Sequence, residues 1–295
     1  MNGILVVDKK KGITSHDVVN ILRRTTGIKK IGHTGTLDPL ATGVLVMCIG
    51  KGTKAVEYLS NDEKEYIANF KFGYETDTLD ITGNTIKKSN HIPSAEMLKS
   101  SLNDFIGKIE QIPPMYSAIK YNGKKLYQYA REGKSVEIIS RTVEITYLDI
   151  IDKTANDSYE IKLICSSGTY VRSLIRDIGY NLNTYATMEN LRRTRAGNFH
   201  INRSVNIDDI KTGGYELIKS NLIPIDFALK EYDNFIVPSN YYKQISNGMA
   251  YKCKLDLNTG ELLKIYCNNE FIGIGSYIDD DSFTGIKINK MLKGD

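Results

Sequence analysis

Residues 32–49 read Gly-His-Thr-Gly-Thr-Leu-Asp-Pro-Leu-Ala-Thr-Gly-Val-Leu-Val-Met-Cys-Ile, a glycine-rich half followed by an apolar half. The apolar half predicts a central β-strand that is buried on both faces. In the first half, Pro39 restricts Asp38 to an extended backbone, and Gly35 and Gly43 permit turns that other residues disfavour. The pattern predicts a loop that holds the Asp38 carboxylate at the edge of a buried strand. A structural turn, in which Asp38 binds local amides, explains the same spacing.

The segment in front of this loop predicts a strand and a helix. Residues 4–7 are all apolar and end at Asp8, which indicates a short buried strand. Thr14 or Ser15 can then cap a helix that ends in arginines, a good match to its negative carboxyl end. The helix has an apolar stripe made of Val18, Ile21 and Leu22.

Two downstream stretches alternate apolar and polar side chains. Residues 66–72 and 159–165 both have this period of two, which predicts half-buried strands. From residue 169 the period becomes helical, and the apolar face consists of Val171, Leu174, Ile175, Ile178 and Leu182. Strands and helices mix without regular β-α-β order. We therefore expect an α+β fold with a mixed, largely antiparallel sheet flanked by helices.

Length and composition predict two domains. The chain has 295 residues, more than a typical single domain. Residues 1–232 carry the elements above, whereas residues 233–295 contain short strand and turn signals. We expect a small β-rich domain in this second part, near the lower practical size for independent folding.

Charge and cysteine content leave the partner open but indicate the compartment. The net charge of +4 permits a nucleic-acid partner without requiring one. Four cysteines are scattered without a C-x-x-C spacing, and Cys48 and Cys165 lie in apolar runs typical of buried thiols. Neither a signal peptide nor a membrane span is evident in the sequence. We expect a cytoplasmic protein with reduced thiols.

Two familiar site patterns fail on spacing. Residues 50–53, Gly-Lys-Gly-Thr, lack the four-residue glycine spacing of a phosphate loop and the Ser or Thr directly after its lysine. His33 and Asp38 lie near each other, but the other histidines are isolated and no third ligand has metal spacing. We therefore expect no metal site.

A second candidate segment is Ser-Ser-Gly-Thr-Tyr-Val-Arg at residues 166–172, where a strand gives way to a helix. Tyr170 and Arg172 lie at the mouth of this junction, a common place for functional side chains. A capped helix with Tyr170 in the core and Arg172 in solvent is a serious alternative.

Residues 115–141 form a third candidate segment, in which cations and tyrosines alternate. They are Tyr116, Lys120, Tyr121, Lys124, Lys125, Tyr127, Tyr129, Arg131, Lys134 and Arg141. Cations neutralise phosphates and aromatic rings stack on unpaired bases, so the interleaving favours RNA over a merely solvated surface. Residues 191–195, Leu-Arg-Arg-Thr-Arg, add positive charge but are equally typical of a helix end.

Five motifs occur in one order along the chain. They are Gly-His-Thr-Gly-Thr-Leu-Asp-Pro-Leu-Ala-Thr-Gly (32–43), Lys-Glu-Tyr (64–66), Gln-Ile-Pro-Pro-Met-Tyr-Ser-Ala (111–118), Gly-Lys-Lys-Leu-Tyr with Tyr-Ala-Arg (123–127 and 129–131) and Gly-Thr-Tyr-Val-Arg (168–172). Over residues 3 to 200 the chain resembles the bacterial tRNA pseudouridine-55 synthases of the TruB family. The tail after Tyr232 resembles the family's PUA domain. The family's Asp-Lys-Pro is replaced here by Asp8-Lys9-Lys10.

The resemblance implies a pseudouridine synthase fold with a C-terminal PUA-like domain, and a role for each matched residue. Asp38 is the catalytic aspartate, and Arg172 pairs with it and keeps it ionised. Tyr66 stacks on the flipped uracil, whereas Tyr170 and Leu191 line the pocket. His33 contacts the T loop, and Lys9 supports the site.

The substrate implied by the resemblance is tRNA, bound through its T arm and isomerised at uridine 55. Residues from about 120 to 145 then form a loop that clasps the T arm. Pseudouridine formation breaks the N1–C1′ bond and rejoins the base through C5, with no net oxidation and no group donated. We expect no cofactor, no obligatory protein partner and a monomer.

One carboxylate can attack covalently or remove a proton, and the sequence leaves both routes open. Three other functions compete with this one. The chain could bind or fold RNA without catalysis, act on guide-selected RNA with partner proteins, or be a metal-dependent hydrolase. A glycosidase is disfavoured because no second catalytic carboxylate stands in a motif.

Overall fold

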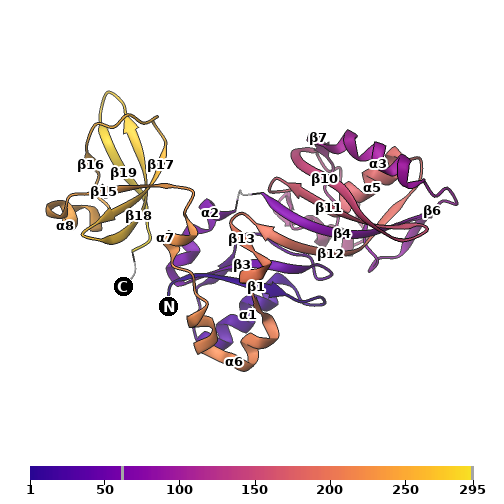
Figure 1. Ribbon diagram of the computed structural model, residues 1–295, viewed down its shortest axis with the longest axis horizontal. Helices are drawn as coiled ribbons and strands as arrows, with labels where there is room; N and C mark the ends of the chain where they lie inside the picture. Colours follow the sequence, from indigo (N-terminus) through magenta and orange to yellow (C-terminus); the bar gives the residue numbers. More distant parts are fainter. Residues whose placement is uncertain (61–62, 294–295) are drawn as a thin grey trace.

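The structure, a computed structural model, describes residues 1–60 and 63–293. Its main sheet has the strand order β14-β1-β3-β12-β4-β11-β10-β7, with β2 beside β3 and β13 beside β12 (Figure 1). The bounds are β1 (Gly3–Lys9), β2 (Ile31–His33), β3 (Thr42–Ile49), β4 (Lys64–Phe72), β7 (Gly107–Gln111), β10 (Arg141–Ala155), β11 (Ser158–Cys165), β12 (Ala186–Ala196), β13 (Phe199–His200) and β14 (Val205–Asn206). Within the described residues β1–β14 and β3–β12 pair parallel and the other neighbours antiparallel. The predicted mixed, largely antiparallel sheet is confirmed.

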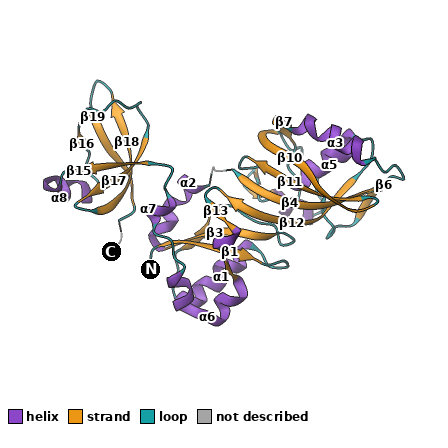
Figure 2. Cartoon of the chain, viewed as in Figure 1, coloured by secondary structure: helices purple, strands orange, loops and turns teal. Residues whose placement is uncertain are grey.

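Helices cover both faces of this sheet. Four of those described share one core with the sheet, namely α1 (Ser15–Thr26), α3 (Ala95–Leu102), α5 (Val171–Asn181) and α6 (Ile207–Ser220). The short helices α2 (Val56–Leu59) and α7 (Ile225–Ala228) pack on the opposite face. In β1, Leu5 and Val7 point to the first core, and Ile4 and Val6 point to the second, which is the period of two expected for a strand. Figure 2 shows α1 and α6 together beneath β1, and α3 and α5 at the other end of the sheet.

Local signals explain the predicted elements. Thr14 caps α1 through a reciprocal capping box with Asp17, and Gly27 ends the helix in the left-handed conformation. In β4 the apolar residues are buried at every second position, as the alternation predicted. Both Cys48 and Cys165 are buried free thiols, and burial raises the pKa of Cys48 to about 12 and that of Cys165 to about 11.

Small hairpins and short helices connect these elements. They are β5 (Tyr74–Thr76) with β6 (Thr85–Lys88), β8 (Lys120–Tyr121) with β9 (Lys124–Lys125), α4 (Leu126–Arg131), and the 3₁₀ turns Gly50–Ala55, Asn103–Phe105, Ile201–Arg203 and Ser239–Tyr241. No helix in the described ranges is long and apolar enough to cross a membrane.

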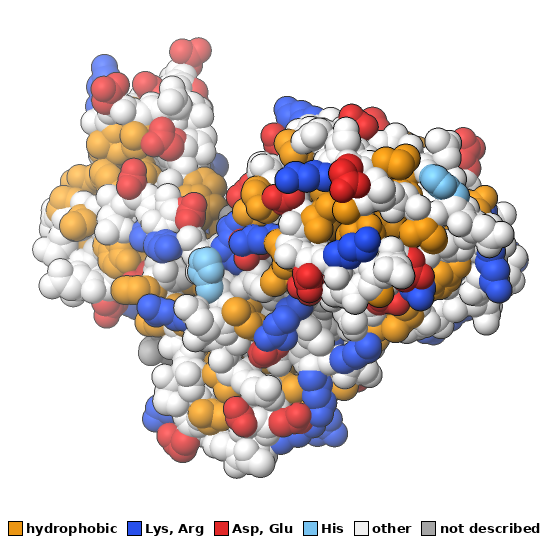
Figure 3. Space-filling view, turned by 45° about the vertical axis from the view of Figure 1, so that its right-hand side comes forward, with side chains coloured by type: hydrophobic (Ala, Val, Ile, Leu, Met, Phe, Trp, Pro, Cys, Tyr) orange, Lys and Arg blue, Asp and Glu red, His pale blue; other side chains and the backbone are white. Residues whose placement is uncertain are grey.

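A second sheet follows from residue 233 and has the order β15-β17-β18-β19-β16. Its elements are β15 (Asp233–Val237), α8 (Tyr242–Ser246), β16 (Tyr251–Lys252), β17 (Leu262–Cys267), β18 (Glu270–Asp279) and β19 (Thr284–Met291). This sheet has a core of its own, but Ile274 and Leu292 also pack into the core around Ala55. The last two residues of the predicted domain 233–295 lie outside the described residues. In Figure 3 the C-terminal part projects from the rest of the molecule, and acidic and basic side chains intermix over the face shown.

At Gly43, in the 32–43 loop, the fold requires a residue without a side chain. Its φ is +98°, and a Cβ there would lie 2.2 Å from the carbonyl oxygen of Arg193, because β3 pairs with β12 at this point. Gly35, which the sequence also marked as a special turn, has no positive φ and has room for a Cβ. That part of the prediction is wrong.

We expect Gly43→Ala to destabilise the protein by at least about 3 kcal/mol, because backbone strain and a clash with backbone atoms add. Gly12→Ala is the matched control, since Gly12 has φ +89° with nothing within 4 Å of a built Cβ. Strain alone costs the control about 1–2 kcal/mol. Urea unfolding measures both variants, and equal midpoints would contradict the steric account.

Candidate active site

The loop between β2 and β3 is pinned on both sides of Asp38. The Ser15 hydroxyl, at the start of α1, donates to the Leu37 carbonyl (3.0 Å) and accepts from the Leu37 amide (2.9 Å). The Ala41 amide donates to the Asp38 carbonyl (3.1 Å), which closes a turn with proline in its second position. Leu37, Leu40 and Ala41 are buried. The Asp38 side chain, 35% exposed, is therefore fixed at a rigid rim.

Arg172 is the direct partner of Asp38. It lies in the first turn of α5, and its side chain is only 5% exposed. Nη2 lies 2.8 Å from Oδ2 of Asp38 and donates to the Tyr116 carbonyl (2.9 Å), while Nη1 donates to the Thr78 carbonyl (2.8 Å). The alternative in which Arg172 is solvated is wrong. The predicted contact between Arg172 and Asp38 is present in the structure.

Asp80 also faces this guanidinium, and the sequence did not reveal it. Its Oδ2 lies 3.8 Å from Nε of Arg172, and its side chain is 7% exposed. Oδ1 accepts hydrogen bonds from the Thr82 amide (2.9 Å) and the Thr78 hydroxyl (3.0 Å). Arg172 therefore lies between one rim carboxylate and one buried carboxylate. In sequence, residues 77–84 are typical of a polar turn, so nothing distinguished Asp80 there.

Two predicted tyrosines lie near Asp38, and the third predicted residue, Leu191, lies on the strand that pairs with the end of the 32–43 loop. Tyr66 on β4 and Leu191 on β12 are both 8% exposed and belong to the same core cluster. The Tyr170 backbone is held twice by the Gln111 side chain, at 2.8 Å and 3.2 Å. Burial raises the pKa of both tyrosines, and the negative charge of Asp38 contributes in each case, so both hydroxyls lie within its field. The rings stay neutral, as a surface that stacks on a base requires.

Lys9 lies beneath the loop with no exposed surface. Its Nζ donates to the carbonyls of Ile13 (2.8 Å), Lys10 (3.0 Å) and Pro39 (3.5 Å), the last being next to Asp38 in the chain. Burial lowers the pKa of Lys9 from 10.5 to about 8, while the charge of Asp38 opposes the shift. The structure thus places Lys9 where it supports the loop.

His33 lies on β2 at the start of the same loop. Burial, with the charges of Arg193 and His16, lowers its pKa, so the imidazole is neutral at pH 7. Nδ1 is buried and has no hydrogen-bond partner in the described part of the chain. His33 borders the loop, and among the described residues no hydrogen bond or ion pair joins it to Asp38 or Arg172.

Residues 191–195 form part of strand β12, so the alternative of a helix end is wrong. Arg193, one of the cations of this run, is 2% exposed. Its Nε donates to the Val44 carbonyl (2.7 Å) and its Nη2 to the Gly35 carbonyl (3.1 Å). A buried guanidinium here joins β12 to the start of β3 and to the 32–43 loop. The sequence of such a run does not show which arginine is buried in the protein. Only the pairing of the strands shows it.

The segment from about 120 to 145 contains the hairpin β8–β9 and α4, and its side chains are largely exposed. Lys125 and Arg131 lie 5.7 Å and 5.3 Å from the ring centre of Tyr127. Glu132 neutralises two of the predicted cations, which are Lys124 and Lys134. Residues 1–60 and 63–293 contain no group of three or more His, Cys, Asp or Glu side chains that could hold a metal ion.

Known proteins resemble this chain in sequence and in fold. Residues 23–171 match the TruB family pseudouridylate synthase (N terminal domain), and residues 172–230 match the tRNA pseudouridylate synthase B C-terminal domain. The tRNA pseudouridine synthase B of Clostridium novyi (strain NT) is 44% identical, with 99% of this chain and 100% of that protein aligned. Its counterpart in Clostridium tetani (strain Massachusetts / E88) is 42% identical, with 99% and 100% aligned.

Solved structures with the same fold are more distant in sequence. A chain from an H/ACA RNP bound to a substrate RNA containing 2′-deoxyuridine has a TM-score of 0.75 at 21% identity, covering 98% of this chain and 84% of that one. A chain from a Cbf5-Nop10-Gar1 complex has a TM-score of 0.72 at 23% identity, with the same coverage. Both show the fold alone. By its family matches and its full-length relatives, this chain belongs to the TruB family of pseudouridine synthases.

Proposed function

We propose that this protein isomerises uridine 55 in the T loop of tRNA to pseudouridine. Its relatives, at about 40% identity over nearly the whole chain, are named tRNA pseudouridine synthase B. The observation that carries the proposal is the 2.8 Å contact between Asp38 and the buried Arg172 at a rigid rim. Tyr66 and Tyr170 lie within the field of Asp38, and their uncharged side chains, with that of Leu191, suit a flat base.

In this proposal Asp38 is the reacting carboxylate. Its Oδ2 is engaged by Arg172, whereas Oδ1 has no ion pair or hydrogen bond among the residues described. Oδ1 is thus available to bond to C1′ or to accept a proton, and the two routes place the same demand on the site. Arg172 fixes the carboxylate before substrate arrives, so little reorganisation is needed during the reaction.

Access to the target requires the base to leave its stack. Flipping a uridine costs a few kcal/mol, and stacking on an aromatic ring returns about 1–3 kcal/mol per base. We propose that Tyr66 supplies this ring, that Tyr170 and Leu191 close the sides of the pocket, and that His33 contacts the T loop. Neutral side chains suit an uncharged base.

The rest of the chain is proposed to hold the T arm of tRNA. In residues 120–145 the lysines and arginines suit the phosphates of an RNA backbone, and the tyrosines suit unpaired bases. We propose residues 1–232 as the catalytic domain and residues 233–295 as a PUA-like RNA-binding domain. We further propose a monomer in the cytoplasm that needs neither a protein partner nor a cofactor.

Position-resolved mapping tests this function. A full-length tRNA transcript is incubated with the purified protein, digested, and analysed by mass spectrometry for pseudouridine. We expect conversion at position 55 and none in a transcript with cytidine there. Conversion at another position, or only after a guide RNA and partner proteins are added, would overturn the proposal.

We expect kcat to fall as the pH rises through about 8. The lowered pKa of Lys9 means that the amine is charged below about pH 8 and neutral above it. Neutral Lys9 loses one donor to the carbonyls around Asp38, and it also loses its attraction for the carboxylate. Rates measured from about pH 6 to about pH 9.5 check this in the wild type and in Lys9→Met. The variant should be slower and lack the fall, so parallel profiles would contradict the role.

A further inference from the structure

Arg172 is held by main-chain carbonyls from two segments, and one of these segments is the turn of a small hairpin. Residues 77–84 supply both the Thr78 carbonyl and the Asp80 carboxylate, and they form the connection of the hairpin β5–β6. At the base of this hairpin Glu75 pairs directly with Lys87 across the two strands. This turn belongs to a two-stranded hairpin, which is at best marginally stable alone, so its position depends on what the hairpin and the turn are attached to.

The turn also contains a strained residue. Leu79, between Thr78 and Asp80, has φ +64° with its side chain buried. A non-glycine residue in this conformation costs of the order of 1–3 kcal/mol and persists only where its surroundings hold it. Main-chain hydrogen bonds to β12 help to hold it there, because the Met188 amide donates to the Leu79 carbonyl (3.2 Å) and the Ile81 amide donates to the Met188 carbonyl (3.0 Å).

A cluster at the hairpin base supplies a second attachment, which joins the hairpin to α5. Glu75 has a 4% exposed side chain, and its Oε1 lies 2.9 Å from Nζ of Lys87. The same Nζ donates to the Tyr180 hydroxyl (2.8 Å) and lies 5.0 Å and 5.3 Å from the ring centres of Tyr180 and Tyr185. Hydrogen bonds to Tyr180 and Glu75 raise the pKa of Lys87 to about 12, so it is charged at neutral pH.

Tyr180 connects this cluster to the reacting pair because it belongs to α5, the helix that carries Arg172. Arg172 lies in the first turn of α5 and Tyr180 at its end. The hairpin therefore contacts α5 at both ends of the helix. Residues 77–84 contact Arg172 at its start, and Lys87 contacts Tyr180 near its end. We propose that Glu75, Lys87 and Tyr180 are positioning residues that hold the hairpin against α5 and so keep Arg172 aligned with Asp38. This inference rests on the function proposed for the Asp38 site.

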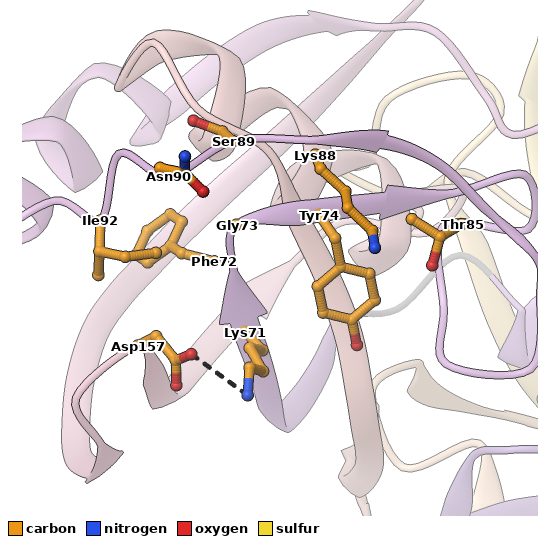
Figure 4. Close-up of a pocket in the computed structure, with 10 residues that line it drawn as sticks. All are labelled: Lys71, Phe72, Gly73, Tyr74, Thr85, Lys88, Ser89, Asn90, Ile92 and Asp157. Carbon is orange, nitrogen blue, oxygen red and sulfur yellow. Dashed lines mark ion pairs between the residues drawn. The ribbon is translucent and has the colours of Figure 1, made fainter.

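The hairpin offers its own control. Tyr74 and Lys88 form the neighbouring cross-strand pair, so their side chains point to the opposite face. There they line an open hollow of about 410 Å³, shown in Figure 4 with Lys71 and Asp157 on its far side. Lys88→Met thus removes a lysine from the same strand without touching α5.

The test compares Lys87→Met with Lys88→Met in single-turnover and steady-state assays of uridine 55 isomerisation. For Lys87→Met we expect kcat about tenfold lower, since small misplacement of a reacting group is costly, with KM for tRNA within about twofold. Lys88→Met should match the wild type in kcat. Lys87→Arg, which keeps the charge and the reach to Glu75, should recover most of the rate.

Lys87→Met leaves the Glu75 carboxylate buried without its cation, so the variant can lose stability. Tyr180→Leu avoids this, because Tyr180 is 42% exposed and Glu75 keeps Lys87. We expect it to lower kcat about fivefold with little change in the unfolding midpoint. The Asp80→Asn background should remove most of the Lys87→Met effect on kcat, because both act on the alignment of Arg172.

An unchanged kcat in both Lys87→Met and Tyr180→Leu would overturn the inference, as would full additivity with Asp80→Asn. A loss confined to KM would instead make the cluster part of the RNA-binding surface and also contradict it. If the wild type itself makes no pseudouridine, the proposed function fails, so the two failures are distinguishable.

Discussion

Asp38→Asn should abolish turnover, with product formation at least about 10⁴-fold slower than in the wild type. Asparagine has nearly the same shape as aspartate, but its amide can neither bond to C1′ nor take up a proton. The loop itself should not move, because Ser15 and the Ala41 amide hold it through main-chain atoms of Leu37 and Asp38. Binding should therefore survive the loss of chemistry.

Filter binding with full-length tRNA and quantification of pseudouridine in the same samples measure the two properties. We expect Kd within about threefold of the wild type. Contacts between cations and phosphates supply most of the affinity for RNA, and a carboxylate makes none of them. The unfolding midpoint should also be preserved and is the control for folding. A variant that still turns over at a tenth of the wild-type rate would sink the assignment of Asp38.

Arg172→Met should have the second largest effect. It removes the ion pair to Asp38, leaves the buried Asp80 carboxylate without its cation, and leaves the carbonyls of Thr78 and Tyr116 without their donor. We expect kcat to fall at least about 10³-fold. The free energy of unfolding should fall by about 3–5 kcal/mol, the usual cost of leaving one buried charge unpaired.

Two further variants separate these effects. Arg172→Lys keeps a charge but cannot make the fork of contacts that guanidinium makes, so we expect it to stay well below the wild-type rate. In Arg172→Met with Asp80→Leu the orphaned carboxylate is gone, so stability should partly return while turnover stays lost. Recovery of turnover along with stability would show that Arg172 serves only the fold.

Sequence periodicity predicted most of the fold, because local burial dictates it. The alternation in residues 66–72 and the helical spacing after residue 169 correspond to β4 and α5. The run at residues 191–195 failed, because cations occur equally at helix ends and in strands that cross a sheet. Pairing of β12 with β3 turns Arg193 inward, and only tertiary structure contains that information.

The site was partly predictable for a similar reason. Asp38 and Arg172 stand in two distinctive motifs, and the structure brings them to 2.8 Å. Asp80 stands in a turn whose composition any loop could have, and its importance comes from the hairpin that folds it onto Arg172. Gly35 and Gly43 looked equivalent in sequence, yet only Gly43 meets the main chain of a neighbouring strand.

The most direct test of the central claim is tritium release from a T-arm RNA labelled at C5 of uridine 55, with a chelator present. Isomerisation through C5 must expel that hydrogen, so release reports the reaction itself rather than binding. We predict stoichiometric release by the wild-type protein alone, with neither cofactor nor partner added. No release from this RNA or from full-length tRNA, or release only when metal is restored, would contradict an account in which Asp38 carries the reaction.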